Sequence, residues 1–538
     1  MKKALGVLLL ASLGLHAMGQ ITQRERPAEW KNLTEGGRFM DRILPMPNGK
    51  TGHGLWGTAE VQNRFIDNGL EQPGMSFWGG NILKDAKGTY HMFVAGWPEN
   101  SPNGHMFWSN STVYHATCDN PIGPFRVIGS IGKGHNPEAY QLGDGRIIVY
   151  VIDGYYIANS LNSPVWTYGK FQFDPRDRKI IEGLSNLTFT RRQDGSFLMV
   201  CRGGGIWISK DGLSTWEQIS DHRVYPPIDG RFEDPVVWRD SLQYHLIVND
   251  WLGRIAYYER SLDGLHWIVE PGEAYLPGCS VHPDGQVEHW FKYERPKIRQ
   301  DKQGRACQIN FAVIDTIKWE DHPNDRHSSK NISIPLNPGM QMEITNAKPI
   351  TNKTKHINLL IKGEEGFNPQ KDLDISSLRF GSFQEVDYGR GAKVVRTQGK
   401  GNDLLLTFPF KGTGIDAKEW APKLIGKKKK EAGGNMVFGY ARRPDIDYEP
   451  MILSARRPTV DSLTQKVSVE IKNYGIKASQ PVEVEVIAGN RSLGKMPLTA
   501  LKPYQTYTLK TDATATKESP FIVRFLFHGK VLDENQFM

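Results

Sequence analysis

Two adjacent carboxylates, Glu233 and Asp234, stand directly before Pro235 in the stretch 230–251. This stretch predicts two short apolar strands joined by the polar turn Arg239-Asp240-Ser241, with the carboxylates at the entrance of the first strand. Like charges that share a partly desolvated place push one pKa upward, so that one group stays protonated near neutral pH. Such a pair is suited to general acid and base catalysis. A solvated acidic turn is the alternative interpretation.

The same local pattern occurs five times in the first two thirds of the chain. Each unit has polar residues at a strand start, an apolar strand, a turn with Asp or Gly, and a second apolar strand. The period of roughly 50–60 residues is long enough for one four-stranded blade of a β-propeller. The strand starts are Trp78-Gly79-Gly80-Asn81, His135-Asn136-Pro137-Glu138, Ser185-Asn186-Leu187-Thr188, Glu233-Asp234-Pro235-Val236 and Glu294-Arg295-Pro296-Lys297. The repeat therefore predicts a five-bladed β-propeller within residues 20–340.

A ring of blades brings strand starts that are far apart in the sequence to one mouth of a central channel. Polar side chains at the same position of each repeat then converge on one pocket. The predicted members of this pocket are Asn81, His135, Asn136, Glu138, Asn186, Glu233, Asp234, Glu294 and Arg295. His135 is a further candidate acid or base, because its unperturbed pKa is close to neutral; a hydrogen bond that caps its strand is the alternative.

The last third of the chain has a different character. Residues 341–447 predict a small accessory β-sandwich, and residues 448–538 alternate apolar and polar side chains, as in the stretches 466–471 and 482–487. Period-two strands with Asn-Tyr-Gly and Ala-Gly-Asn turns favour an immunoglobulin-like β-sandwich. The predicted fold class is therefore all-β, a five-bladed β-propeller followed by two β-sandwich domains. Neither sandwich shows a site, so a spacer or docking role is expected.

The first residues have the form of a bacterial signal peptide. Met1-Lys2-Lys3 is positively charged, the run from Ala4 to Leu15 is too short to span a bilayer, and Ala17-Met18-Gly19 offers small residues for cleavage. We expect residues 1–19 to be removed and the protein to be periplasmic, cell-surface-associated or secreted. The four cysteines are widely spaced and predict neither a zinc site nor a defined disulfide.

The net charge of +8 permits anionic partners. Part of it lies in the run Lys427-Lys428-Lys429-Lys430, which is best interpreted as a solvated loop. No basic face with interleaved aromatic residues is present, so a nucleic acid is not expected as partner. An acidic polysaccharide remains an option, because cationic residues can steer anionic chains toward a cleft. The oligomeric state stays undecided.

Over about residues 78–312, the short repeat motifs given above resemble the five-bladed β-propeller glycoside hydrolases of the family 43 type. The resemblance implies a glycosidase without cofactor or metal that acts on plant or algal polysaccharides or oligosaccharides. It implies Glu233 as the general acid and Asp234 as the carboxylate that orients the substrate and tunes the pKa. The first unit departs from the family, since Trp78-Gly79-Gly80-Asn81 has no carboxylate where the base is expected. The nearest replacements are Glu138 and Glu294.

The chemistry of a glycosidic bond explains why two carboxyl groups are needed. One protonates the leaving oxygen, and the other activates water or attacks through an oxocarbenium-like transition state. Glu294 is a candidate for the second role, or else an ion-pair partner of Arg295 or Lys297.

Four further residues are candidates for substrate binding. Trp78 and Trp251 offer flat apolar platforms for sugar rings. Arg202 is a candidate for a carboxylate or sulfate on the substrate. Asp250 either orients one of these groups or ends its hairpin, and the second role is favoured.

Two other functions compete with the glycosidase interpretation. The missing carboxylate in the first unit favours a non-catalytic carbohydrate-binding propeller. A six-bladed sialidase-like enzyme fits less well, because no sixth unit is visible. The segment 319–327 contains several potential metal ligands at a spacing that matches no known site, and we interpret it as a loop at the end of the propeller.

Overall fold

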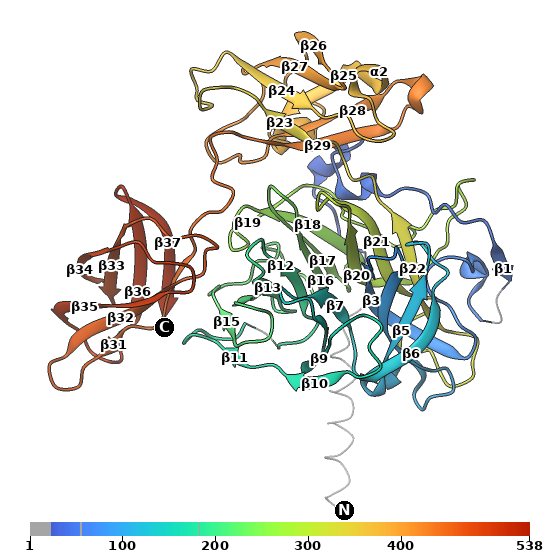
Figure 1. The fold of residues 1–538 in the computed structure, drawn as a ribbon, viewed down its shortest axis with the longest axis horizontal. Coiled ribbons are helices and arrows are strands. Elements are labelled where there is room, and N and C mark those ends of the chain that lie inside the picture. The colour runs from blue at the N-terminus through green and yellow to red at the C-terminus, as the bar shows by residue number, and fades with distance from the viewer. Residues whose placement is uncertain (1–22, 54–55, 182, 538) are drawn as a thin grey trace, which may run out of the picture.

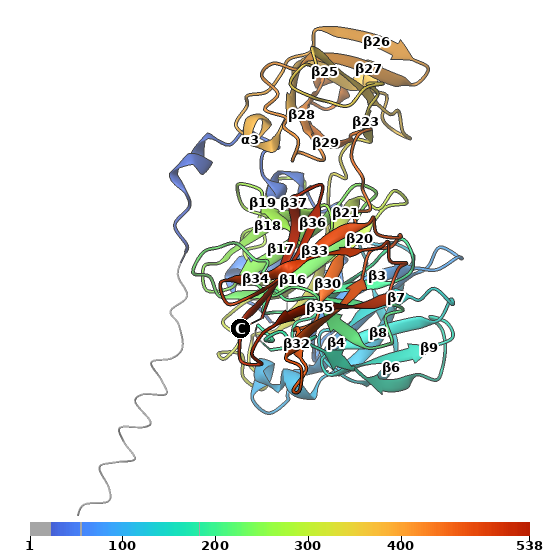
Figure 2. The same cartoon turned by 90° about the vertical axis from the view of Figure 1, so that its left-hand side faces the viewer.

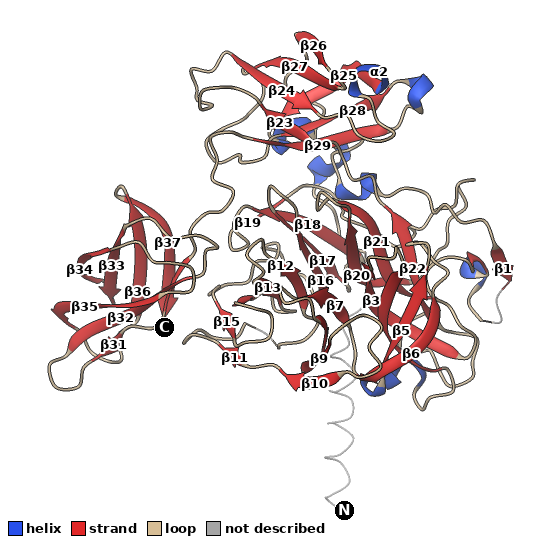
Figure 3. Cartoon of the chain, viewed as in Figure 1, coloured by secondary structure: helices blue, strands red, loops and turns tan. Residues whose placement is uncertain are grey.

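A computed structural model describes residues 23–53, 56–181 and 183–537 (Figure 1). The expected signal peptide lies outside these residues. Strands dominate every part of the described chain, and the helices are short (Figure 3). The protein is all-β, as the sequence predicts. The helical segments are η1 (Ala28–Asn32), η2 (Phe39–Arg42), η3 (Ala59–Val61), η4 (Gly104–Asn110), α2 (Pro369–Asp372), α3 (Phe383–Val386) and η5 (Lys430–Ala432).

Five antiparallel sheets follow one another in the first two thirds of the chain. The first sheet contains β3 (Met75–Lys84), β4 (Tyr90–Pro98), β5 (Thr112–Cys118) and β6 (Arg126–Lys133). The second contains β7 (Glu138–Gln141), β8 (Ile147–Val151), β9 (Gly154–Ala158) and β10 (Thr167–Lys170). The third contains β12 (Thr188–Arg191), β13 (Phe197–Val200), β14 (Ile206–Ser209) and β15 (Trp216–Gln218), and β11 (Phe173–Asp174) pairs with β15 in parallel. The last two contain β16 (Phe232–Arg239), β17 (Tyr244–Asp250), β18 (Ile255–Ser261) and β19 (Trp267–Val269), and β20 (Lys292–Gln300), β21 (Ala306–Ile314) and β22 (Ser329–Pro335).

The first strands of these sheets form a closed ring. β3 contacts β7, β7 contacts β12, β12 contacts β16, β16 contacts β20, and β20 contacts β3 again. In Figure 1 these five strands lie around the centre of the domain. The N-terminal chain closes the fifth sheet, because Leu70 pairs with Asn331 and Ile43 pairs with Leu336. A separate hairpin of β1 (Thr51–His53) and β2 (Asn63–Phe65) lies in this N-terminal segment. This is the architecture of a five-bladed propeller.

The second residue of every predicted repeat has a left-handed backbone. The φ angles are 66° at Gly79, 54° at Asn136, 48° at Asn186, 53° at Asp234 and 48° at Arg295. In β3, β16 and β20 this residue belongs to a bulge, where the strand register shifts. Pro235 and Pro296 follow at the bulges of β16 and β20, because a bulged residue does not have to donate a ladder hydrogen bond, and Pro137 precedes the start of β7. The bulges divide the central channel into an upper and a lower layer of side chains.

The lower layer consists of the fourth residue of each unit and is closed by internal hydrogen bonds. Asn81 binds both the N–H and the C=O of Ala139, at 2.7 and 2.8 Å. Glu138, which is 2% exposed, forms an ion pair with Lys297 and accepts a hydrogen bond from Tyr140 Oη at 2.6 Å. This layer locks neighbouring blades together.

The middle part of the chain forms one seven-stranded sheet that curves over itself. Its order is β25 (Leu373–Gly381), β28 (Lys423–Lys428), β29 (Met436–Arg442), β23 (Met342–Ile344), β24 (His356–Ile361), β27 (Asp403–Pro409) and β26 (Arg396–Lys400). Phe380 of β25 and Phe408 of β27 lie on opposite arms, yet their ring centroids are only 5.0 Å apart. The expected accessory sandwich is therefore built from a single continuous sheet around one core.

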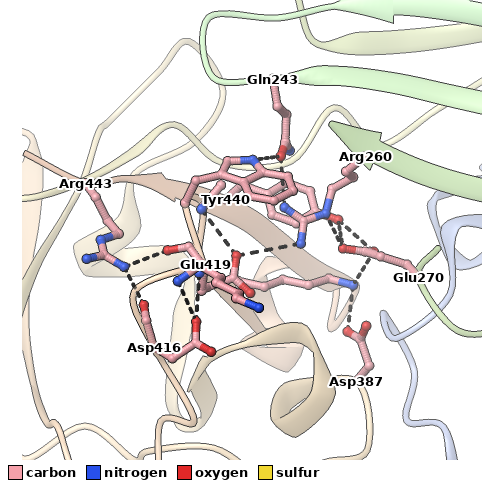
Figure 4. A network of polar contacts seen from close by, with 12 residues as sticks. Gln243, Arg260, Glu270, Asp387, Asp416, Glu419, Tyr440 and Arg443 are labelled. Carbon is pink, nitrogen blue, oxygen red and sulfur yellow. Dashed lines mark hydrogen bonds and ion pairs between the residues drawn. The ribbon is translucent and has the colours of Figure 1, made fainter. Parts of the chain in front are cut away.

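A buried polar network joins this sheet to the propeller (Figure 4). Glu270, which follows β19, pairs with Arg260 at 2.5 Å and with Lys423 at 3.4 Å, and accepts a hydrogen bond from Tyr440 Oη at 2.9 Å. Lys423 also contacts Asp387 at 2.6 Å. Because these charged groups are fully buried, each needs its partner, and the network fixes the sheet against the fourth blade.

The C-terminal part is a sandwich of two four-stranded sheets around a shared apolar core. One sheet contains β30 (Leu453–Ala455), β31 (Thr459–Val460), β32 (Lys466–Asn473) and β35 (Thr506–Thr514), and the other β33 (Val482–Ala488), β34 (Arg491–Leu498), β36 (Phe521–Phe527) and β37 (Lys530–Phe537). It lies beside the propeller in Figure 1 and in front of it after the turn of Figure 2. Arg178 contacts Ser454 Oγ at 2.9 Å across this boundary. The cysteines Cys118, Cys201, Cys279 and Cys307 are free thiols.

The lower layer of the channel yields a stability prediction. Lys297→Met leaves the Glu138 carboxylate buried without its cation, and we expect the free energy of unfolding of the propeller to fall by about 3–5 kcal/mol. Chemical denaturation followed by tryptophan fluorescence measures this loss. Adding Glu138→Gln to Lys297→Met removes the stranded charge and recovers part of the stability, whereas Lys302→Met in an exposed turn is neutral. Equal stability of Lys297→Met and the wild type would contradict the assigned role of the pair.

Candidate active site

A cleft of about 250 Å³ opens at one mouth of the propeller ring. The first residue of every repeat unit lines it: Trp78, His135, Ser185, Glu233 and Glu294. Four of the five second residues also line it, namely Asn136, Asn186, Asp234 and Arg295. The left-handed turn at the second position directs the first side chain of every unit toward the mouth and, in the four units other than the one with Gly79, the second side chain as well. The convergence predicted from the repeat is therefore present in the structure.

A chain of hydrogen bonds links the second residues around the ring. Asn136 Nδ2 donates to Asn186 Oδ1 at 3.1 Å, and Asn186 Nδ2 donates to Asp234 Oδ1 at 2.9 Å. From the other side, Arg295 donates to Asp234 through its backbone N–H and through Nη1, each at 3.2 Å. Asp234 is 2% exposed and is held from both neighbouring blades. It is positioned to orient neighbouring groups.

In the first blade the second residue of the unit is Gly79, which has no side chain, and the Arg295 side chain lies beside it. A Cβ built on Gly79 would lie 3.6 Å from Arg295 Cβ and 3.8 Å from Arg295 Cγ. The φ angle of 66° also favours glycine. The Arg295 side chain thus occupies the space beside the first blade, where the family resemblance leads one to expect a carboxylate.

Glu233 has the properties of an acid that is protonated near neutral pH. Its side chain is 21% exposed and lies 3.7 Å from Arg202. Burial is the largest cause that raises the pKa of the Glu233 carboxyl, to about 7; the charges of Asp234 and Glu294 act in the same direction, and Lys318 and Arg202 oppose it. Burial and two neighbouring anions thus outweigh two cations.

Glu294 faces Glu233 and has the opposite electrostatic environment. Burial disfavours ionisation of the Glu294 carboxyl, but Lys318 and Lys292 outweigh it and lower its pKa to about 2. Lys292 Nζ lies 3.1 Å from Glu294 Oε1, and Lys318 contacts the other oxygen. Carboxylate oxygens of Glu233, Asp234 and Glu294 all lie within 4.8 Å of one another. The cleft therefore contains two close carboxyl groups whose pKa values are pushed far apart.

Three close carboxylates are also a potential metal site, but their partners argue against it. Arg295 binds Asp234, Lys292 and Lys318 bind Glu294, and Arg202 approaches Glu233. A cation would have to displace or lie beside four positive side chains, which Coulomb repulsion disfavours. The donor set does not fit a resident metal ion.

His135 and the predicted tryptophans form walls of the cleft. His135 is buried, shares a hydrogen bond of 3.0 Å with Ser111 Oγ, and packs against the Trp108 ring at 4.9 Å. Burial and then Arg295 lower its pKa well below the usual value, so the ring is neutral and is not the acid of this site. Trp78 and Trp251 both line the cleft, with Lys318 Nζ 4.9 Å from the Trp78 ring and Lys292 Nζ 4.4 Å from the Trp251 ring.

Three predicted site residues do not line the cleft. Glu138 and Asn81 lie in the lower layer, where Glu138 pairs with Lys297 and Asn81 binds Ala139. Of the two bases predicted from the sequence, Glu294 lines the cleft and Glu138 does not. Asp250 ends β17, where its carboxylate accepts hydrogen bonds from the backbone N–H groups of Arg231 and Gly253 at 3.1 and 3.2 Å. It terminates the hairpin, the role that the sequence favours.

Several residues of the cleft were not found from the sequence. Most of them lie outside the four-residue strand starts of the repeat, and Ser185 is an uncharged residue at the first position of its unit. These residues are His105, Met106, Trp108, Ile152, Ser185, Lys292, Lys318 and Trp319. The segment η4 carries the first three, and the loop after β21 carries Lys318 and Trp319. Of these residues, only Lys292 could have been predicted from the sequence. Side chains alternate along a strand, so Lys292 lies on the same face of β20 as Glu294. The segment 319–327, which the sequence predicts to be a loop at the end of the propeller, thus begins with a residue of the cleft lining, Trp319.

Comparison with known proteins places glycoside hydrolases among the structures that are similar to this chain. No family model and no curated protein matches the sequence. A family 117 glycoside hydrolase of the marine bacterium Zobellia galactanivorans aligns at 10% identity and a TM-score of 0.35, over 50% of this chain and 88% of its own. An endo-arabinase of Bacteroides thetaiotaomicron aligns at 13% and 0.30, over 49% and 94%. A family 43 protein of Bacillus licheniformis aligns at 8% and 0.33, over 90% of both chains. At these values the similarity carries no information about individual residues.

The electrostatics of the cleft predict how Glu233 titrates. We expect its pKa to fall in Asp234→Asn, because a neighbouring negative charge is removed, and to rise in Lys318→Met, because a neighbouring positive charge is removed. ¹³C NMR of protein with labelled glutamate carboxyls measures both shifts, and Glu233→Gln identifies the resonance. Asp301→Asn, in a turn of the fifth blade, is the control. A wild-type Glu233 that titrates near pH 4.5 would refute the assignment.

Proposed function

We propose that this protein is a glycoside hydrolase that cleaves glycosidic bonds of polysaccharides or oligosaccharides in the propeller cleft. The observation that carries the proposal is the pair Glu233 and Glu294. Their oxygens lie within 4.8 Å, and burial and neighbouring charges raise the pKa of Glu233 to about 7 and lower that of Glu294 to about 2. Two carboxyl groups with separated pKa values match the acid and the ionised partner that glycosidic cleavage requires.

Glu233 is the proposed general acid. At neutral pH a substantial fraction carries the proton that the leaving oxygen needs. Its side chain reaches the cleft and retains 21% exposure, so the proton can be replaced from solvent after each turnover. Asp234 raises the pKa of Glu233 and is itself held by Asn186 and Arg295. It therefore acts as the tuning and orienting carboxylate.

Glu294 is the proposed ionised partner. A carboxylate that stays charged throughout the working pH range stabilises the positive charge that develops on the sugar ring in the transition state. Its position on β20 is rigid, because Lys292 and Lys318 hold one oxygen each. We prefer Glu294 to Glu138, the alternative base predicted from the sequence, because Glu138 does not line the cleft and pairs with Lys297.

The remaining lining is suited to sugar hydroxyl groups and ring faces. Asn136 Oδ1 and His105 Nδ1 are buried and have no hydrogen-bond partner among the described residues. Both residues line the cleft, so hydroxyl groups of a ligand can satisfy them. Trp78, Trp108 and Trp251 supply aromatic surface beside these polar atoms. Export of the protein follows from the signal-peptide pattern of residues 1–19 and is part of the proposal.

A non-catalytic carbohydrate-binding propeller is the competing function. It is favoured by the two lysines on Glu294, since a carboxylate held by two cations is a weak base. Both functions require binding of a saccharide, and only cleavage separates them.

The decisive experiment is a substrate screen with full-length protein and the matched pair Glu233→Gln and Glu518→Gln. We expect Glu233→Gln to lower kcat/KM on natural oligosaccharides about 10²–10⁴-fold, because it removes the proton donor. Glycosides with a nitrophenyl leaving group, which departs without protonation, should lose much less activity. Glu518 is exposed in the C-terminal sandwich, and its variant should behave as the wild type. Saccharide binding without any cleavage would favour the competing function.

A pH profile gives a second test of the same assignment. Because Glu233 must be protonated, wild-type kcat/KM should fall as pH rises through about 7, where the free enzyme loses this proton. Glu294, with a pKa of about 2, should not limit activity on the acid side above pH 3. A profile that rises through pH 7 would contradict the acid role of Glu233.

A further inference from the structure

Cationic side chains outnumber carboxylates among the described residues that line the cleft: Arg202, Lys292, Arg295 and Lys318 against Glu233, Asp234 and Glu294. When Glu233 holds the proton that catalysis requires, two carboxylates of this described lining, Asp234 and Glu294, remain charged. The two histidines of the lining do not add positive charge, since burial, followed by nearby cations, keeps the pKa of His105 and His135 well below the usual value.

The two cations that act on the Glu233 carboxyl are also the more exposed cations of the lining. The side chains of Arg202 and Lys318 are 39% and 23% exposed, whereas those of Lys292 and Arg295 are 7% and 1% exposed. Arg202 lies 3.7 Å from Glu233, and the positive charges of both Lys318 and Arg202 act on the Glu233 carboxyl. Arg202 and Lys318 therefore form a positive pair at the place of the proposed acid.

We infer that the sugar bound beside Glu233 carries a negative charge, a carboxylate or a sulfate ester, which Arg202 and Lys318 bind. Both side chains line the cleft and are partly exposed, so a negatively charged group on a sugar beside Glu233 can contact both of them. Arg202 offers a planar guanidinium suited to two oxygens of such a group, and Lys318 offers a second positive charge. The position next to the scissile bond rests on the proposed glycosidase function, whereas preferential binding of an anionic saccharide does not.

The test uses full-length Glu233→Gln, which keeps the uncharged state of the acid and cannot protonate a leaving group. Calorimetric titration with matched neutral, sulfated and uronate forms of galacto-, gluco- and manno-oligosaccharides separates the two sources of negative charge. We expect at least one anionic form to bind about tenfold more tightly than its neutral counterpart at low salt, with an advantage that shrinks as salt increases. Adding Arg202→Gln should remove this advantage and leave neutral saccharides unaffected.

Arg146→Gln is the matched control. Arg146 is 41% exposed and pairs with Asp144, so it resembles Arg202 in exposure and partner but lies in a turn of the second blade. Lys318→Met in the same background should weaken anionic ligands as Arg202→Gln does, and circular dichroism confirms that each variant is folded.

The outcomes distinguish this inference from the proposed function. Neutral saccharides that bind as well as the anionic ones, or anionic saccharides that none of the titrations detects, overturn the inference. Cleavage of a neutral substrate by the wild type would then still support the glycosidase. Tight, Arg202-dependent binding of an anionic saccharide that the wild type never cleaves supports the inference and refutes the glycosidase.

Discussion

The left-handed residue at the start of each inner strand is the constraint on which the rest of the propeller depends. L-amino acids rarely adopt a positive φ, yet Asn136, Asn186, Asp234 and Arg295 all do so at equivalent places in the ring, together with Gly79. The turn directs the first side chain of each unit, and in four of the five units the second as well, into the mouth. The fourth residue lies in the lower layer, as Asn81 and Glu138 do. The strain is offset by contacts between blades: Asn136, Asn186 and Asp234 bind one another, and Arg295 closes the chain.

The charges of the cleft follow from this geometry. Five blades deliver their side chains to a space of about 250 Å³, so the carboxylates of Glu233, Asp234 and Glu294 meet at short range. Three buried anions repel one another unless cations separate them. Arg295 and Lys292 come from the fifth inner strand itself, and Lys318 reaches in from the loop after β21. Lys318 and Lys292 outweigh burial at Glu294, whereas burial and the charges of Asp234 and Glu294 outweigh Lys318 and Arg202 at Glu233, and this difference separates the two pKa values.

The repeat made much of this arrangement predictable from sequence alone. The period of the repeat and the shared position of its polar residues are enough to predict the five strand starts, the ring and the convergence of the polar side chains. These side chains are Asn136, Asn186, Glu233, Asp234 and Glu294. The depth of a side chain along the channel could not be predicted. Asn81 and Glu138 belong to the same repeat pattern as the residues of the mouth but lie below it, and the sequence pattern does not reveal the bulge before Asn81. Lys318 and Trp108 come from unrepeated segments, so no periodicity points to them. The curved seven-stranded sheet was expected as a sandwich, since local alternation does not show which strands pair.

The first blade has no carboxylate at the mouth, and the residue beside this place is Arg295. Gly79 has no side chain, and Arg295 lies against the place where one would begin. Gly79 contributes no charge to the mouth, and Arg295 of the fifth blade places a positive side chain beside it. Arg295 also binds Asp234, the carboxylate that raises the pKa of Glu233. Arg295 thus adds positive charge to the lining and holds the carboxylate that favours the protonated state of the proposed acid.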